Sequence, residues 1–133
     1  MNDEDIRSLL KESKVIAVVG LSANPSRPSH GVTKFLIQQE YEIYGVNPGQ
    51  TSILGRPCFE SLNLVPKLVD IVDVFRNSDA VPQIIDDAIK IKAKAVWLQE
   101  GVTHPVAEEK ARKAGLFVVS NLCILKEHRR LIP

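Results

Sequence analysis

Five short apolar runs, rich in valine and isoleucine and separated by amphipathic segments, constrain the fold of this chain more than any other feature. They are VIAVV (15–19), YEIYGV (41–46), VDIVDVF (69–75), AVWL (95–98) and LFVVS (116–120). Such runs are typical of parallel strands that are buried on both faces. Because helical segments lie between them, the pattern predicts β-α-β units with right-handed crossovers.

The segments between the runs carry apolar residues at helical spacing. Predicted helices contain Ile6, Leu9 and Leu10; Val32, Phe35 and Leu36; Val81, Ile84, Ile85, Ala88 and Ile89; and Ala107, Ala111 and Ala114. We expect Ser29 and Ser78 to cap two of these helices and Gly115 to end the last. The link 47–68 is irregular, with one short helical turn between Phe59 and Leu64. The sequence thus predicts an α/β, three-layer Rossmann-like domain over 1–133. Its doubly wound five-stranded parallel sheet has the order 3-2-1-4-5, with helices on both faces.

Composition excludes several classes of function. Basic and acidic residues nearly balance, at 17 and 16, which argues against nucleic acid or a membrane surface as partner. No apolar stretch approaches the roughly 20 residues that span a bilayer. Cys58 and Cys123 lie far apart and form no C-x-x-C pair, so neither a disulfide framework nor a metal site is expected. We expect a soluble, cytoplasmic protein, and a homo-oligomer or an unknown protein partner stays open.

The segment GLSANPSRPSHG (20–31) follows the first predicted strand, where nucleotide-binding proteins place their phosphate loop. It lacks G-x-G-x-x-G, because Ser22 and Pro25 occupy glycine positions. The free N–H groups of the following helix favour an anion. Polar and rigid residues of the loop suit a phosphate: three hydroxyls (Ser22, Ser26 and Ser29), one forked cation (Arg27) and two stiffening prolines (Pro25 and Pro28). The loop therefore predicts a phosphate-bearing ligand.

The end of the second predicted strand lacks the carboxylate that a dinucleotide site uses to bind ribose hydroxyls. The strand runs into Asn47-Pro48-Gly49 instead. An acid there repels a ribose phosphate, whereas an amide does not. This pattern permits a phosphorylated ribose, as in NADP or coenzyme A. The remaining polar turns, FRN (75–77) and QEG (99–101), follow the third and fourth runs and are expected on the same rim.

Several motifs together resemble the small single-domain CoA-binding proteins, which are similar to the nucleotide-binding domain of the succinyl-CoA synthetase α subunit. The motifs are GLSANPSRPS, VNPGQ, IVDVFR, VWLQEGV and C-x3-EHRRL, in family order over 15–131. The resemblance implies a Rossmann-like fold that holds coenzyme A at the rim. The ligases' phosphohistidine domain and ATP-grasp partner have no counterpart in this sequence, and Gln50 replaces a lysine of their second-strand loop.

Chemistry and resemblance together assign cofactor-binding roles. We expect Gly20 to allow close backbone approach, and we expect phosphate contacts from the loop Ser22, Asn24, Ser26, Arg27, Pro28 and Ser29. The adenosine end is expected beside Asn47 and Pro48. The third strand leads into Phe75 and Arg76, with Arg76 toward a phosphate, and the fourth-strand side is lined by Gln99 and Gly101. No catalytic or metal-binding residue is assigned. We expect binding of coenzyme A or an acyl-CoA without catalysis. An NAD(P)-binding sensor, a subunit of an enzyme acting on CoA thioesters, and a protein-interaction module in which the nucleotide is structural remain alternatives.

A few residues outside these motifs have two interpretations. We expect Cys58, Cys123 and Trp97 to be core residues. Asp73 interrupts an apolar run, and backbone amides or a helix start are expected to bond it, although a catalytic base stays open. His128, in the KEHRR segment, is expected on a solvated face or at a partner contact.

Overall fold

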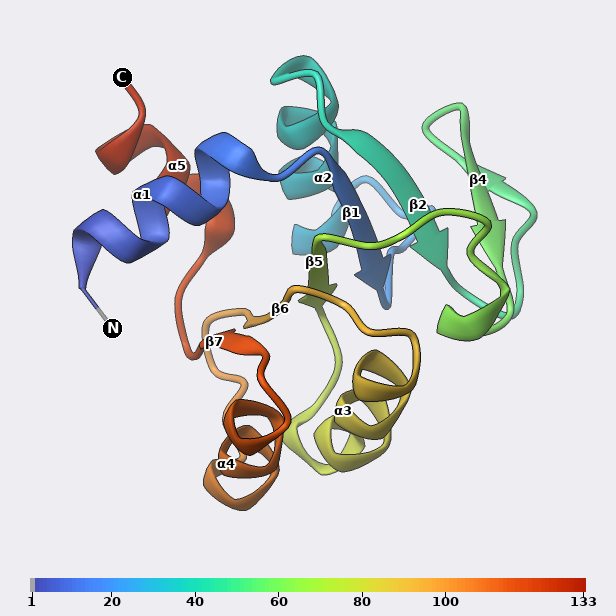
Figure 1. Ribbon diagram of the computed structural model, residues 1–133. Helices are drawn as coiled ribbons and strands as arrows, with labels where there is room; N and C mark the ends of the chain where they lie inside the picture. The colour runs from blue at the N-terminus through green and yellow to red at the C-terminus, as the bar shows by residue number, and fades with distance from the viewer. Residues whose placement is uncertain (1) are drawn as a thin grey trace.

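The computed structural model describes residues 2–133, which form one sheet with helices on both faces (Figure 1). The strands are β1 (Val15–Val19), β2 (Glu42–Val46), β3 (Ser52–Ile53), β4 (Arg56–Phe59), β5 (Ile71–Val74), β6 (Ala95–Leu98) and β7 (Phe117–Val119). The helices are α1 (Asp3–Glu12), α2 (Pro28–Gln38), α3 (Val81–Lys90), α4 (Pro105–Lys113) and α5 (Ile124–Leu131), with short 3-10 helices at Leu62–Leu64 and Ser78–Ala80. This arrangement confirms the Rossmann-like α/β class.

The sheet has seven strands in the order β3-β4-β2-β1-β5-β6-β7, so the prediction of five strands in the order 3-2-1-4-5 is wrong. The predicted third strand, β5, pairs with β1 rather than with β2. The place beside β2 belongs to β4, which lies in the segment expected to be irregular. All pairs are parallel except β3 with β4. β4 was not predicted because this strand is short and contains Pro57. β3 was not predicted because it has only two residues.

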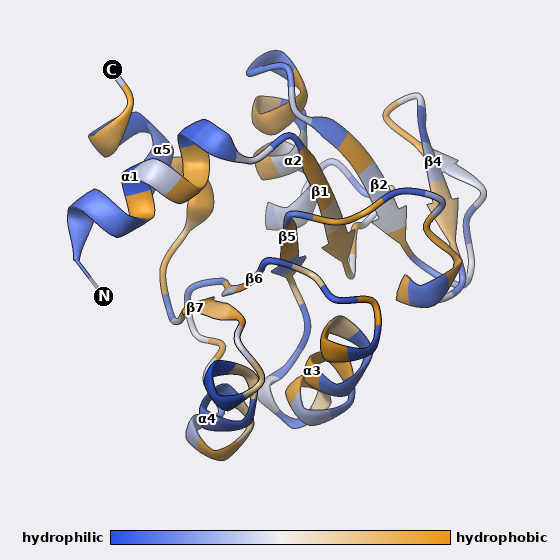
Figure 2. Cartoon of the chain, viewed as in Figure 1, coloured by the Kyte–Doolittle hydropathy of each residue, from blue (hydrophilic) through white to orange (hydrophobic). Residues whose placement is uncertain are grey.

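Two hydrophobic layers hold the sheet between its helices, and the apolar stripes of the helices face it (Figure 2). Helices α1, α2 and α5 cover one face, where Leu10, Leu36 and Ile124 pack with Trp97. Helices α3 and α4 cover the other face, where Ile85 and other small apolar side chains pack on β5 and β6. Trp97 is fully buried and donates its indole N–H to the Leu122 carbonyl at 2.8 Å, which confirms it as a core residue.

Helix ends account for several local predictions. Gly115 follows α4 with φ +94°, which confirms the glycine stop. Ser78 does not cap α3, because a 3-10 helix comes first; its Oγ instead accepts a hydrogen bond from the Thr103 N–H. Leu62–Leu64 confirms the predicted helical turn. Every helix within residues 2–133 is too short or too polar to cross a membrane.

The C-terminal helix α5 corrects the expectation for His128. Its imidazole is buried, edge-on to the rings of Phe35 at 5.3 Å and Tyr41 at 5.9 Å. Burial lowers the pKa of His128, so the neutral ring is favoured inside the protein. The charged part of the segment faces outward, where Arg130 bonds Asp3 of α1 with both oxygens at 2.8 Å. The segment therefore has a packed face as well as a solvated one.

Candidate functional site

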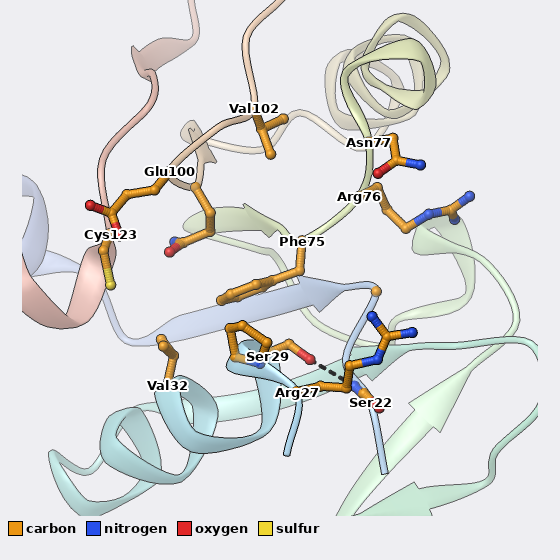
Figure 3. A pocket seen from close by; sticks show the side chains of 13 residues that line it. Ser22, Arg27, Ser29, Val32, Phe75, Arg76, Asn77, Glu100, Val102 and Cys123 are labelled. Atoms are coloured by element: carbon orange, nitrogen blue, oxygen red, sulfur yellow. Dashed lines mark hydrogen bonds between the residues drawn. The ribbon is translucent and has the colours of Figure 1, made fainter. Parts of the chain in front are cut away.

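A cavity of about 620 Å³ opens at the carboxyl ends of the parallel strands (Figure 3). It is lined by Gly20, Ser22, Arg27, Pro28, Ser29, Val32, Phe75, Arg76, Asn77, Gln99, Glu100, Val102 and Cys123. The loops after β1, β5 and β6 supply most of these residues. Because β2 and β5 lie on opposite sides of β1, this is where the strand order reverses, the usual ligand position in such sheets. The volume suits a small molecule or cofactor.

The loop after β1 is held by hydrogen bonds among its own short side chains. Ser29 Oγ accepts from the Ser22 N–H at 2.9 Å, and Ser22 Oγ accepts from the Asn24 N–H at 3.0 Å. Asn24 Oδ1 in turn accepts from the Ser26 N–H at 3.0 Å. Ser22 and Ser29 line the cavity, and each hydroxyl that accepts a bond keeps its own proton to donate. These bonds within the loop fix its conformation.

The start of α2 faces this loop. The N-cap residue is Arg27, and the helix begins at Pro28, so the prediction that Ser29 is the cap is wrong by two positions. Proline favours the first helical position because it has no N–H to leave unpaired. Ser29 lies within the first turn and is buried. The first-turn N–H groups that remain free give this end of the helix a partial positive charge.

Two arginines place positive charge at the cavity. Arg27 comes from the loop before α2, and Arg76 comes from the loop after β5. Both are exposed, and neither forms an ion pair or a side-chain hydrogen bond within residues 2–133. A guanidinium offers a planar fork of donors that matches phosphate oxygens. The arrangement can therefore bind a phosphate group from two loops.

Gly20 brings these two loops together. Its φ is +89°, and a Cβ there lies 2.6 Å from the Phe75 carbonyl oxygen and 3.0 Å from Arg76 Cδ. A side chain at this position both clashes and strains the backbone. The glycine is therefore required by the close approach of the β1 and β5 loops, which holds Phe75 and Arg76 beside the loop after β1.

A buried acid lies behind the cavity wall. Asp73 is fully buried, and its Oδ1 accepts from Gln99 Nε2 at 2.5 Å. Its Oδ2 has no partner within residues 2–133, so the expectation that backbone amides bond this side chain is wrong. Burial raises the pKa of Asp73 to about 8, against a smaller lowering by the Gln99 hydrogen bond. The carboxyl group is therefore largely protonated and uncharged at neutral pH.

Comparison with known proteins decides the family. Residues 14–129 match the family described as the CoA binding domain. The chain belongs to the CoA-binding domain family. It is 37% identical over 124 residues to the uncharacterized protein YneT of Bacillus subtilis, covering 93% of this chain and 92% of YneT. The structure of a hypothetical protein from Pyrococcus horikoshii OT3 has a TM-score of 0.97 at 39% identity, covering 100% of this chain and 94% of that one.

A third relative is a larger enzyme. Over 74 residues, the chain is 31% identical to the ADP-forming acetate–CoA ligase I of Archaeoglobus fulgidus. The match covers 56% of this chain but 11% of the ligase. The CoA-binding domain described here thus corresponds to a small part of that enzyme.

The CoA-binding domain brings most of the expected residues to the cavity wall, but five lie outside the lining: Asn24, Ser26, Asn47, Pro48 and Gly101. Asn47 Nδ2 donates to the Leu21 carbonyl at 2.8 Å, and its Oδ1 accepts from the Gly49 N–H at 2.8 Å. Asn47 therefore ties the loop after β2 to the loop after β1. The Gly101 N–H donates to Asn121 Oδ1 at 2.7 Å. The ligand contacts of all thirteen expected residues stay predictions.

Sequence reasoning missed five lining residues of this CoA-binding domain: Val32, Asn77, Glu100, Val102 and Cys123. Asn77 and Glu100 lie in polar turns that the sequence already placed on the rim. Cys123 follows β7, whose carboxyl end lies at the same edge as the others, so topology alone provides a signal for it. Cys123 is half-buried, packs against the core and also lines the cavity, so the expectation of a core cysteine holds only in part for Cys123, whereas Cys58 is buried as expected.

Proposed function

We propose that this chain binds coenzyme A or an acyl-CoA in the cavity and performs no chemistry on it alone. The observation that carries the proposal is the pair of arginines at the switch point of the sheet, Arg27 and Arg76, neither of which has a carboxylate partner among residues 2–133. Unpaired guanidinium groups from two loops favour a ligand with more than one phosphate. Membership of the CoA-binding domain family and the relationship to an acetate–CoA ligase support coenzyme A as that ligand.

Within this proposal, the phosphates bind between Arg27 and Arg76, with the hydroxyls of Ser22 and Ser29 and the first turn of α2 as further donors. Asn24 and Ser26 support the loop through their mutual hydrogen bonds. The adenosine end lies toward Asn47 and Pro48, next to the loop that Asn47 anchors. The uncharged arm of the ligand extends past Phe75 toward Gln99 and the Gly101 turn.

The absence of a carboxylate at the end of β2 favours coenzyme A over NAD. Asn47 occupies that position, and both polar atoms of its amide are bonded to backbone. The position therefore presents no negative charge to a phosphate on the ribose. NADP shares this feature, so a direct comparison of the two ligands belongs in the test.

Isothermal titration with coenzyme A tests the proposal, using native protein and the variants Arg27→Ala and Arg76→Ala. Each variant loses charge-assisted hydrogen bonds worth about 1.5–3 kcal/mol, so Kd rises on the order of tenfold to a hundredfold. Lys34→Ala is the matched control, because Lys34 is an exposed cation of α2 that does not line the cavity. Its Kd stays within about threefold of native.

Four results contradict parts of the proposal or all of it. If native protein binds neither coenzyme A nor acetyl-CoA, the whole proposal is wrong. If native protein and both arginine variants have equal Kd values, the phosphates do not bind at Arg27 and Arg76. If NADP binds with a Kd tenfold lower than that of coenzyme A, the proposed ligand is NADP and not coenzyme A. An acetyl-CoA thioester that is hydrolysed faster with protein than without contradicts the absence of catalysis.

A further inference from the structure

The cavity has two chemically different sides. Arg27 and Arg76 lie on one side, and Cys123 lies on the opposite side, with the Phe75 ring between them (Figure 3). The Cys123 side carries no unpaired cation among its lining residues, and Glu100 is paired with Lys126 Nζ at 3.1 Å. Val32 and Phe75 add apolar surface. One side thus suits phosphates, and the other suits an uncharged and partly apolar arm.

A buried polar pair, Gln99 and Asp73, lies at the Cys123 side of the cavity. Gln99 is 5% exposed and lines the cavity. Its Oε1 accepts from the Ile124 N–H at 3.4 Å, and this bond fixes the residue next to Cys123 against the cavity wall. Its Nε2 has a second proton besides the one given to Asp73.

Asp73 lies on the same sheet face as Phe75, because strand residues two apart share a face. Its Oδ2 is buried and has no partner within residues 2–133. Buried polar atoms are nearly always bonded, so Oδ2 marks an unmet hydrogen bond directly behind the Gln99 amide that lines the cavity. Gln99, and not Asp73, presents polar surface to the cavity on this side.

We propose that Cys123 forms a mixed disulfide with the thiol end of a coenzyme A molecule bound in this cavity. The inference rests on the proposed function, since it requires the ligand's phosphates at Arg27 and Arg76. Coenzyme A carries its thiol at the end of an uncharged arm that starts from the diphosphate. With the diphosphate at the arginines, the arm extends toward the opposite side, where Cys123 is half-buried but reachable from the cavity.

The step is a thiol–disulfide exchange with coenzyme A disulfide as the oxidant. The Cys123 sulfur, as thiolate, attacks one sulfur of the disulfide bound in the cavity. The bond between the two coenzyme A sulfurs breaks, and a bond between Cys123 Sγ and one of them forms. The second coenzyme A leaves as a thiolate and takes up the proton that Cys123 lost. One thiol and one disulfide exchange partners, and no outside electrons are needed. An excess of reduced thiol reverses the exchange.

The experiment measures adduct formation by intact mass spectrometry after mixing reduced native protein with coenzyme A disulfide. The expected product gains one coenzyme A less two hydrogen atoms, at Cys123 by peptide mapping, and dithiothreitol removes it. Glutathione disulfide is the comparison reagent, because it lacks the nucleotide and its phosphates. Docking raises the local concentration of the reactive sulfur, so coenzyme A disulfide reacts at least about tenfold faster. Cys123→Ser forms no adduct.

Matched variants separate docking from simple thiol exposure. Cys58→Ala reacts as native protein does, because Cys58 is buried between β2 and β4 and does not line the cavity. Arg27→Ala loses most of the preference for coenzyme A disulfide, whereas Lys34→Ala keeps it. Equal rates with the two disulfides, or an adduct on Cys58, overturn the inference.

Titration of native protein with coenzyme A in the presence of a phosphine reductant distinguishes the two proposals. Tight reversible binding without any adduct from the disulfide overturns the mixed disulfide and leaves the proposed function standing. No reversible binding overturns both.

Discussion

The buried Asp73 carboxyl group makes the stability of this protein depend on pH in a direction opposite to that of most carboxylates. Its pKa is about 8 in the folded protein, against an ordinary value of 3.8 for an aspartate in the unfolded chain. Below pH 3.8 the group is protonated in both states. Between these values the folded protein holds a proton that the unfolded chain has lost. The free energy of unfolding therefore falls as pH rises, by about 1.4 kcal/mol per pH unit, and this loss ends above about pH 8.

Asp73→Asn removes this dependence while keeping the geometry. An asparagine amide oxygen accepts the Gln99 Nε2 hydrogen bond as Asp73 Oδ1 does, and the amide carries no ionisable proton. The difference in unfolding free energy, variant minus native, grows by about 2.7 kcal/mol between about pH 5 and pH 7. Contributions from all other titrating groups are shared by both proteins and cancel in this difference.

Urea denaturation at about pH 5, 6, 7 and 8 measures the difference, with the slope of unfolding free energy against urea concentration checked for constancy. Asp79→Asn is the control, because Asp79 is an exposed carboxylate of the 3-10 helix before α3. It measures how far the loss of one exposed negative charge alone changes the unfolding free energy. A flat difference for Asp73→Asn across the same range refutes the argument, because it requires Asp73 to be ionised inside the folded protein.

Two further substitutions test the packing that supports the cavity. Gly20→Ala lowers the unfolding free energy by about 2 kcal/mol or more, because the new Cβ lies 2.6 Å from the Phe75 carbonyl oxygen at φ +89°; an unchanged urea midpoint contradicts the close approach. Thr33→Val raises the unfolding free energy by about 1 kcal/mol, because Thr33 Oγ1 is buried in α2 without a partner among residues 2–133 and valine has the same shape; a lower melting temperature for this variant shows that the hydroxyl is bonded in solution.

The sequence predicted those strands whose signal is their own composition. β1, β2, β5, β6 and β7 are nearly continuous apolar runs, because the two hydrophobic layers cover the two faces of the sheet. β4 gives no such signal, since Arg56 and Pro57 make up half of it. Missing β4 also caused the wrong strand order, because the position beside β2 was assigned to the next apolar run.

The candidate site was predictable to the extent that topology determines it. Parallel strands end at one edge, so the polar turns around Ser22, Arg76 and Gln99 come together there. Side-chain hydrogen bonds are not determined by topology. Asn47 bonds the Leu21 carbonyl and so anchors two loops to each other, a role that the sequence did not predict. Cys123 was missed because the residues after the last strand carry no turn or phosphate motif.

The separation of roles between strands and loops has a consequence for how this fold changes in evolution. The crevice exists because the chain reverses its direction of travel across the sheet at β1, and that reversal is secured by residues buried in the two layers. Most of the side chains that line the crevice stand on loops and contribute little to those layers. Successive substitutions in the loops can therefore alter ligand preference at small cost in stability, while the crevice itself is inherited unchanged.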